Sequence, residues 1–342
     1  MFSKYFAVQT THIVQSFLNL SIRLNLLIQQ YITRIHLPPG DVDRRFVLQS
    51  SVQTIKLDDN ELEHLFSYSA LNGIRLVYPC LKSIILTNIP PRDAKYIEYF
   101  SWFRPFLLLL KMNFLITGGN AFNHHLLNRI FENNDDCKIE TVSVKYSILS
   151  IQELEHEHPC SSIKSSTLNV KSYYHLLSLF EYLPALELCD VRISNDVDDS
   201  KGRSTITEVR LKQFFCTILS CFHNYDHLEE LIVRNFSSSL EHLPIYLKTS
   251  YIINGEILES KLIRNLLNLQ QFQFYITCLT NENDIDMLIR THQSDYWLQN
   301  YPDGIMFYYL LDTNYCASFS LPYAFDHFEY ISNNICNYRL TR

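Results

Sequence analysis

Apolar residues recur along the chain at the spacing Leu-x-x-Leu-x-Leu, with other aliphatic or aromatic residues in place of leucine. Each match predicts a short strand whose apolar side chains face a core. The apolar triplets are Val52, Ile55 and Leu57; Leu81, Ile84 and Leu86; Ile139, Val142 and Val144; Leu186, Cys189 and Val191; Leu228, Leu231 and Val233; and Leu269, Phe272 and Phe274. Two units share a proline two residues before the first anchor, Pro79 and Pro184. Weaker matches around Leu110 and Leu168 would divide the two longest intervals.

Stretches with helical spacing lie between these triplets, in residues 94–103, 121–131, 173–183 and 206–222. Each unit is therefore predicted to be a strand followed by a helix. One such unit cannot bury its own apolar face, so neighbouring units must stack. The pattern predicts an α/β fold, an irregular leucine-rich-repeat solenoid over residues 46–290. A doubly wound α/β domain is the structural alternative, because a leucine-rich chain produces some matches by chance.

The two ends of the chain depart from this pattern. An amphipathic pattern over residues 11–28 predicts two short helices within an N-terminal element of residues 1–37. Residues 296–330 contain twelve aromatic residues, which two strands joined at Asp303-Gly304 would explain. We expect residues 291–342 to form an aromatic-rich C-terminal cap that closes the last repeat.

Composition and charge narrow the classes of partner. Hydrophobic residues make up 47% of the chain, which is enough to fill a core. A net charge of -7 gives no basic footprint, so we expect neither nucleic acid nor a membrane as partner. The most apolar run, residues 106–116, is too short to cross a bilayer. Nine cysteines without a C-x-x-C pair favour reduced, mostly buried thiols and a cytoplasmic or nuclear protein.

Two segments resemble metal sites. His156, His158 and Cys160 alternate, so on a strand they would share one face and suit zinc. No fourth ligand is evident, so we expect a polar surface loop and no metal site here. The segment from Asp196 to Ser200 resembles the start of a calcium loop. Lys201 stands where that loop needs glycine, so we expect a solvated loop without metal.

Signatures of catalysis are missing from the sequence. Gly118-Gly119 is the only glycine pair and lacks the further residues of a phosphate-binding loop, so it is interpreted as a strand-to-helix turn. The chain contains neither a G-x-S-x-G nor an H-E-x-x-H motif. We expect a protein that is not an enzyme, with no catalytic residue and no cofactor.

The N-terminal element carries a resemblance to a known family. Its residues Phe17-Leu18-Asn19-Leu20-Ser21-Ile22-Arg23-Leu24-Asn25 resemble the distal half of an F-box, in the order Phe-x-Asn-Leu-x-x-Arg-x-Asn. The Leu-Pro and acidic residue that open the family's motif have no counterpart here, so the resemblance is to a partial F-box. It implies a substrate receptor that docks on the adaptor of a cullin-RING ubiquitin ligase and recruits an unknown target protein. The adaptor-docking helices would then contain Phe17, Leu18, Leu20, Leu24 and Leu27. The alternative function is a leucine-rich-repeat scaffold with no ubiquitin link.

Overall fold

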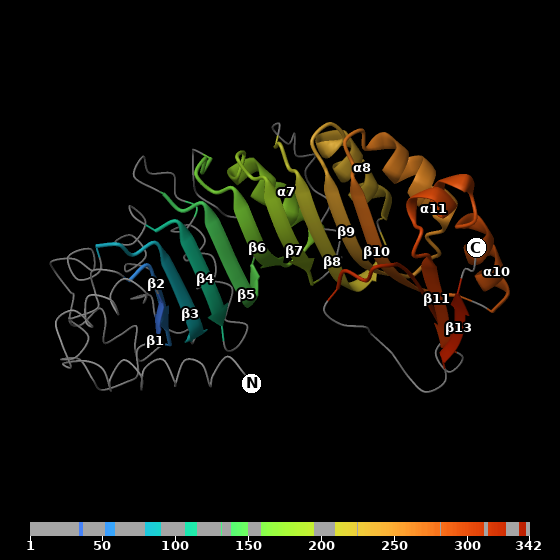
Figure 1. Cartoon of the computed structure of the whole chain (residues 1–342), viewed down its shortest axis with the longest axis horizontal. Helices are drawn as coiled ribbons and strands as arrows, with labels where there is room; N and C mark the ends of the chain where they lie inside the picture. Colours follow the sequence, from blue (N-terminus) through green and yellow to red (C-terminus); the bar gives the residue numbers. More distant parts are fainter. Residues whose placement is uncertain are drawn as a thin grey trace. The chain divides into compact units, whose positions relative to one another are not determined.

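The chain divides into two compact units, Met1–Ser147 and Ile148–Arg342. Figure 1 labels their strands and helices. A computed structural model describes residues 34–36, 52–58, 79–89, 107–114, 131, 138–149, 159–194, 209–223, 225–280, 282–310, 314–325 and 335–339. The predicted docking residues Phe17, Leu18, Leu20, Leu24 and Leu27 lie outside the described residues.

The first unit is built on parallel strands that pair in chain order. They are β1 (Arg34–His36), β2 (Thr54–Leu57), β3 (Ser83–Ile89), β4 (Leu109–Phe114) and β5 (Thr141–Leu149), which runs up to the boundary between the units. Their register places Ile55, Ile84, Leu110 and Val142 side by side, and each is at most 1% exposed. A continuous apolar row therefore forms the core of this unit.

The second unit contains a mixed sheet. Parallel strands again follow chain order: β6 (Ser165–Val170), β7 (Leu188–Ile193), β8 (Gln213–Phe222), β9 (His242–Thr249) and β10 (Gln271–Leu279). Three antiparallel strands complete the order β10-β12-β11-β13, namely β11 (Ile305–Leu310), β12 (Tyr315–Ser320) and β13 (Ile335–Arg339).

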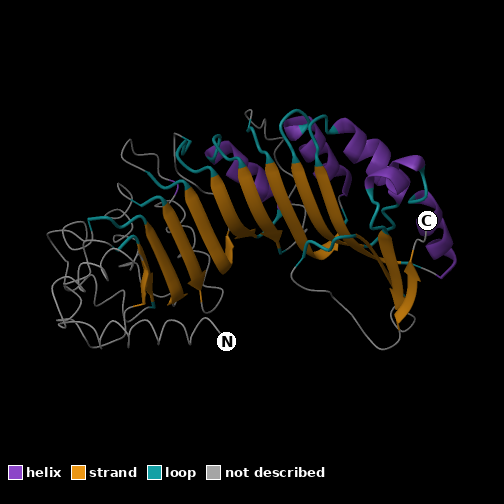
Figure 2. Ribbon diagram, in the orientation of Figure 1, coloured by secondary structure: helices purple, strands orange, loops and turns teal. Residues whose placement is uncertain are grey.

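Helices of the second unit lie together on one side of its strands (Figure 2). They are α7 (Tyr173–Tyr182), α8 (Tyr225–Phe236), α9 (Gly255–Ile257), the π-helix η3 (Leu258–Leu262), the 3-10 helix η4 (Ile263–Asn265), α10 (Glu282–Thr291) and α11 (Asp295–Asn300). Phe180 of α7, Phe214 of β8 and Phe236 of α8 pack edge to face or tilted, with ring centroids 5.2 to 6.1 Å apart. These three rings anchor α7 and α8 on the sheet.

A shared hydrogen-bond arrangement aligns the beginnings of neighbouring strands. The Gln53 carbonyl oxygen accepts from the backbone N–H groups of Lys82 and Ser83, both at 2.9 Å. In the second unit, the Glu187 carbonyl accepts in the same way from Lys212 at 2.8 Å and Gln213 at 3.0 Å. Because each pair of strands starts at the same point, the buried positions of successive strands stay in one row.

The prediction of an irregular leucine-rich-repeat solenoid is wrong. Over the described residues the chain is a mixed α/β structure, with mostly parallel strands in sheets that do not close and few helices. The regular alternation of strand and helix fails at two places: predicted helix 206–222 contains strand β8, and the predicted strand at Leu228 lies inside α8. The reason is that Leu228, Leu231 and Ile232 are buried at i, i+3 and i+4, which is the spacing of a helical face.

Five of the predicted strands and one predicted helix are confirmed. Strands β2, β3, β5, β7 and β10 occur at the remaining triplets, and α7 fills predicted helix 173–183. The weaker matches at Leu110 and Leu168 also lie in strands, β4 and β6. The strand expected before Asp303-Gly304 is instead helix α11, because Trp297 and Tyr301 are spaced to pack on one helical side.

Candidate protein-interaction surface

Successive residues of the second unit's strands face opposite sides of the sheet. One side carries Phe214 and the helices, and the other carries its neighbour Phe215. Register places Thr167, Asp190 and Phe215 in one row on that second side, and Asn169, Arg192 and Thr217 in the next. The part of the second side on β6 to β9 is called the open face, and its residues are Thr167, Asn169, Asp190, Arg192, Phe215, Thr217 and His242.

Aromatic residues continue the same side of the sheet from β9 onward. We call this cluster the aromatic patch; it consists of the rings of Tyr246, Tyr275, Tyr308 and Phe319 together with Ala317. The rings of Tyr246 and Tyr275 stack with centroids 4.7 Å apart, and the hydroxyl groups of Tyr275 and Tyr308 are hydrogen-bonded. Register continues the row from Thr217 into Tyr246, then Tyr275, then Phe319.

A covering segment, residues 321–325, packs on the aromatic patch. Tyr323 contacts Tyr275 and Phe319 with ring centroids 5.9 and 5.5 Å apart, and Phe325 contacts Tyr246 at 5.6 Å. Its backbone is held too, since the side-chain amide of Gln273 donates to the Pro322 carbonyl at 3.2 Å. The patch is therefore a buried core and not an exposed apolar surface.

The open face is only partly buried. The Phe215 ring meets the His242 ring edge to face at 5.1 Å, and His242 Nε2 lies 3.2 Å from Gln273 Oε1. Arg192 is exposed and forms no ion pair with any residue that the structure describes. Phe215 is a partly buried aromatic ring, and Arg192 near it is exposed and, within the described ranges, unpaired. Aromatic residues and arginine are the types that contribute most to the affinity of protein–protein interfaces.

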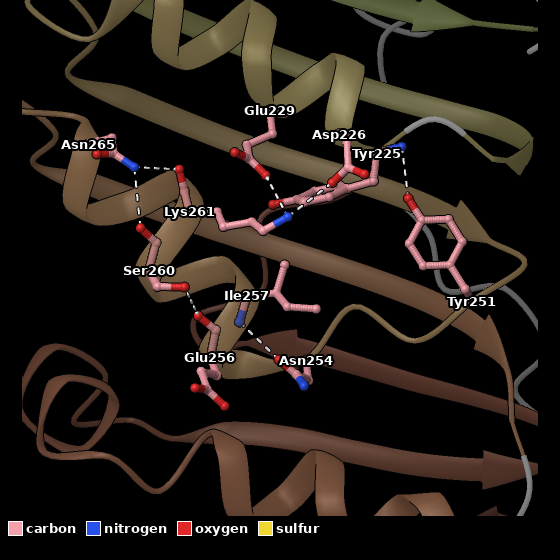
Figure 3. A network of polar contacts seen from close by, with 10 residues as sticks. All are labelled: Tyr225, Asp226, Glu229, Tyr251, Asn254, Glu256, Ile257, Ser260, Lys261 and Asn265. Carbon is pink, nitrogen blue, oxygen red and sulfur yellow. Dashed lines mark hydrogen bonds and ion pairs between the residues drawn. The ribbon is translucent and has the colours of Figure 1, made fainter.

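A polar network on the helical side ties α8 to the segment that contains α9, η3 and η4 (Figure 3). Lys261 Nζ lies 3.2 Å from Asp226 Oδ1 and 4.0 Å from Glu229 Oε2. The Tyr251 hydroxyl accepts from the Tyr225 backbone N–H at 2.8 Å. Figure 3 shows Tyr225, Glu229 and Lys261 reaching toward one another, yet the buried Tyr225 Oη and Glu229 Oε2 have no hydrogen-bond partner among the described residues.

Electrostatics in this network do not indicate catalysis. Burial raises the pKa of the Glu229 carboxyl, and Lys261 opposes that rise. Burial likewise raises the pKa of the Tyr225 hydroxyl, so this group stays neutral. Lys261 and Asp226 are half or more exposed, so their ion pair contributes little stability. The network is interpreted as a structural link between α8 and η3.

His292 is the most strongly perturbed histidine among the described residues. It is 0% exposed and lies among the rings of Phe274, Trp297 and Phe307, with centroids 4.9 to 5.8 Å away. Its Nδ1 lies 2.9 Å from the Leu288 carbonyl, and burial lowers its pKa to about 4. A neutral histidine sealed in this way has no access to a substrate.

Most of the predicted metal and turn residues cannot be placed. His156, His158, residues 196–201 and Gly118-Gly119 lie outside the described residues. Cys160 is described and is 1% exposed, so at this residue the prediction of a surface position is wrong. Among the residues that the structure describes, no three metal-binding side chains gather at one point.

Cysteines of the described parts are thiols. Five of them are buried, Cys160, Cys189, Cys216, Cys278 and Cys316, and Cys80 is exposed. Burial raises the pKa of Cys189 to about 12, so this thiol stays protonated and unreactive. No helix in the described ranges combines the length and apolarity needed to cross a bilayer.

Sequence reasoning missed the residues of the open face. Phe215 and Thr217 fall within the stretch predicted as a helix, so their shared side of a strand was not evident. Arg192 and Asp190 stand between correctly predicted apolar positions of β7, and period-two alternation from Cys189 is the signal that places them together. In comparisons of the sequence with protein-family models and with curated proteins, nothing matches.

Proposed function

We propose that this chain is a protein-interaction module that works as an F-box-like substrate receptor. Its N-terminal residues Phe17, Leu18, Leu20, Leu24 and Leu27 would dock on the adaptor of a cullin-RING ubiquitin ligase, as the resemblance in the sequence implies. The open face would bind the protein to be ubiquitinated. The receptor itself would catalyse nothing.

One observation carries the binding part of this proposal, namely the contrast between the two halves of one sheet side. The aromatic patch is covered by residues of the same chain, whereas Phe215 is half-buried and Arg192 is exposed. Burying a ring and pairing an arginine on binding is a common source of affinity, at about 2 kcal/mol or more for each dominant residue.

The adaptor part is tested by mixing the purified chain with purified adaptor and measuring complex formation by size-exclusion chromatography and calorimetry. Leu20→Asp and Leu24→Asp should abolish the complex, because a charge would be buried at the docking helices. Gln15→Asp, a change at a polar position of the same segment, is the matched control. Equal binding by the wild type, the Leu24 variant and the control would contradict docking through these residues.

An interaction scaffold with no ubiquitin link is the second candidate function. The open face favours it equally, because nothing in that surface depends on an adaptor. If the wild-type chain does not bind the adaptor but a partner binds at Phe215 and Arg192, the scaffold is the correct function.

A further inference from the structure

We propose that the open face binds an extended segment of a partner protein that carries an aromatic side chain and a carboxylate two residues apart. The carboxylate would pair with Arg192, and the aromatic ring would pack on Phe215. This inference rests on the proposed binding role of the open face and specifies the chemistry of the partner.

The covering segment shows which kind of chain this side of the sheet accepts. Its Leu321, Tyr323 and Phe325 are partly buried, whereas the intervening Pro322 and Ala324 are exposed. Every second side chain of this segment faces the sheet, as in a strand, and its backbone bends at Leu321, Pro322 and Phe325. A single hydrogen bond from Gln273 to the Pro322 carbonyl supplements the ring contacts.

The open face continues this surface without a break. Phe325 contacts Tyr246 on β9, and Tyr246 is the register partner of Thr217 on the open face. Gln273, which holds Pro322, also lies 3.2 Å from His242, whose ring contacts Phe215. A second segment on β6 to β9 would therefore meet fewer rings than the covering segment does, chiefly Phe215 and His242, and more polar side chains.

The charges of the open face select an acidic partner. Arg192 is exposed and without an ion pair among the described residues, while Asp190 already has an interaction of its own. Lys248, the next cation on this side, lies over the Tyr315 ring at 5.5 Å. A guanidinium group binds a carboxylate through two parallel hydrogen bonds, so Arg192 provides a directional site for Asp or Glu.

Strand geometry sets the spacing of the partner's two side chains. Asp190 is the register partner of Phe215, so Arg192 lies two residues along β7 from the position beside Phe215. Phe215 and Arg192 are thus about 4.8 Å apart across the strands and about 6.6 Å apart along them, roughly 8 Å in all. Side chains i and i+2 of an extended partner that lies diagonally to the strands, about 6.6 Å apart, meet both because the arginine side chain is long.

A phage-displayed library of random dodecapeptides, selected on the full-length chain, tests the proposal. Enriched peptides should share an aromatic residue and an Asp or Glu at i and i+2. Synthetic copies of these peptides are then measured by fluorescence anisotropy on the wild type, Arg192→Glu, Phe215→Ala and Arg234→Glu. Arg234 on α8 is the matched control, since its side chain is 75% exposed and α8 packs on the side of the sheet opposite the open face.

Arg192→Glu should weaken binding at least tenfold, and a peptide with Lys in place of its acidic residue should restore it. Phe215→Ala should weaken binding by a similar factor, and Arg234→Glu should leave it unchanged. Circular dichroism and thermal melting verify that each variant is folded.

The remaining outcomes separate the partner chemistry from the binding role. Peptides that depend on Phe215 but lack the acidic residue, or that tolerate Arg192→Glu, overturn the partner chemistry and leave the open face as a binding surface. If no peptide is enriched, or the enriched peptides ignore Phe215→Ala, both the partner chemistry and the binding role of this face are refuted.

Discussion

The buried imidazole of His292 should make the protein lose stability in mild acid. His292 is neutral when folded because burial among Phe274, Trp297 and Phe307 lowers its pKa to about 4 from 6.5. The unfolded chain therefore takes up a proton first as the pH falls. The free energy of unfolding is unaffected by His292 above pH 6.5, declines as the pH falls from 6.5 to 4, and changes no further below that.

The size of the effect follows from the gap between the two pKa values. A difference of about 2.5 pH units corresponds to about 3 kcal/mol once the pH is below 4. At pH 5 the loss is about 2 kcal/mol, which is a large part of the stability of an ordinary domain. Among the described residues, the rings around His292 are not titratable, and its Nδ1 partner is a backbone carbonyl, so the loss is assigned to the imidazole itself.

Urea unfolding at pH 7.5, 6.5, 5.5 and 5.0 measures this slope. His292→Asn keeps a donor near the Leu288 carbonyl but does not titrate, so its stability should fall less between pH 7.5 and 5.0, by about 2 kcal/mol. His227→Asn, a change at an exposed position of α8, should retain the slope of the wild type. Parallel pH profiles for the wild type and His292→Asn would refute the reasoning.

Three further changes test the packing. Ile84→Asp buries a charge in the row of Ile55 and Leu110 and should prevent folding, whereas the chain with Ile85→Asp, on the other side of β3, should fold. Circular dichroism distinguishes the two variants, and a folded Ile84→Asp chain would contradict the register. Gly255→Ala should destabilise by about 1–3 kcal/mol in thermal melting, because its Cβ would lie 2.5 Å from the Thr291 carbonyl oxygen; unchanged melting would disprove that close approach. Tyr225→Phe should leave the stability in urea unchanged or raise it, since the Tyr225 hydroxyl has no hydrogen-bond partner among the described residues. Tyr251→Phe removes the acceptor of the Tyr225 N–H and should cost about 1 kcal/mol. A larger loss of stability for Tyr225→Phe than for Tyr251→Phe would contradict the network.

The strands of the parallel parts could be predicted because their apolar positions are unambiguous. Ile55 and Val142 stand between polar or small residues and are buried as expected. The segment from Tyr225 to Phe236 could not be predicted, because Leu-x-x-Leu fits a helix as well as a strand. In a helix, Ile232 and Phe236 extend the apolar side begun by Leu228, and packing on Phe214 stabilises that choice.

The candidate surface could not be predicted for a different reason. Thr217, Arg192 and Phe215 come to lie together on one side of the sheet only when β7 and β8 are paired in register. A single sequence does not show which strands pair. The predicted docking residues at the N-terminus remain predictions, because they lie outside the described residues.

One row of side chains runs from the open face into the aromatic patch. The row contains Arg192 and Thr217 on β7 and β8, and then Tyr246, Tyr275 and Phe319 on the following strands. Aromatic rings on a sheet side gain stability by being covered, so residues 321–325 pack on them. Thr217 and Arg192 carry polar groups, so burying them gains less stability than burying the rings. The change from tyrosine to threonine along this row therefore marks the limit between the covered aromatic patch and the open face, which is the part of this side that we propose binds another protein.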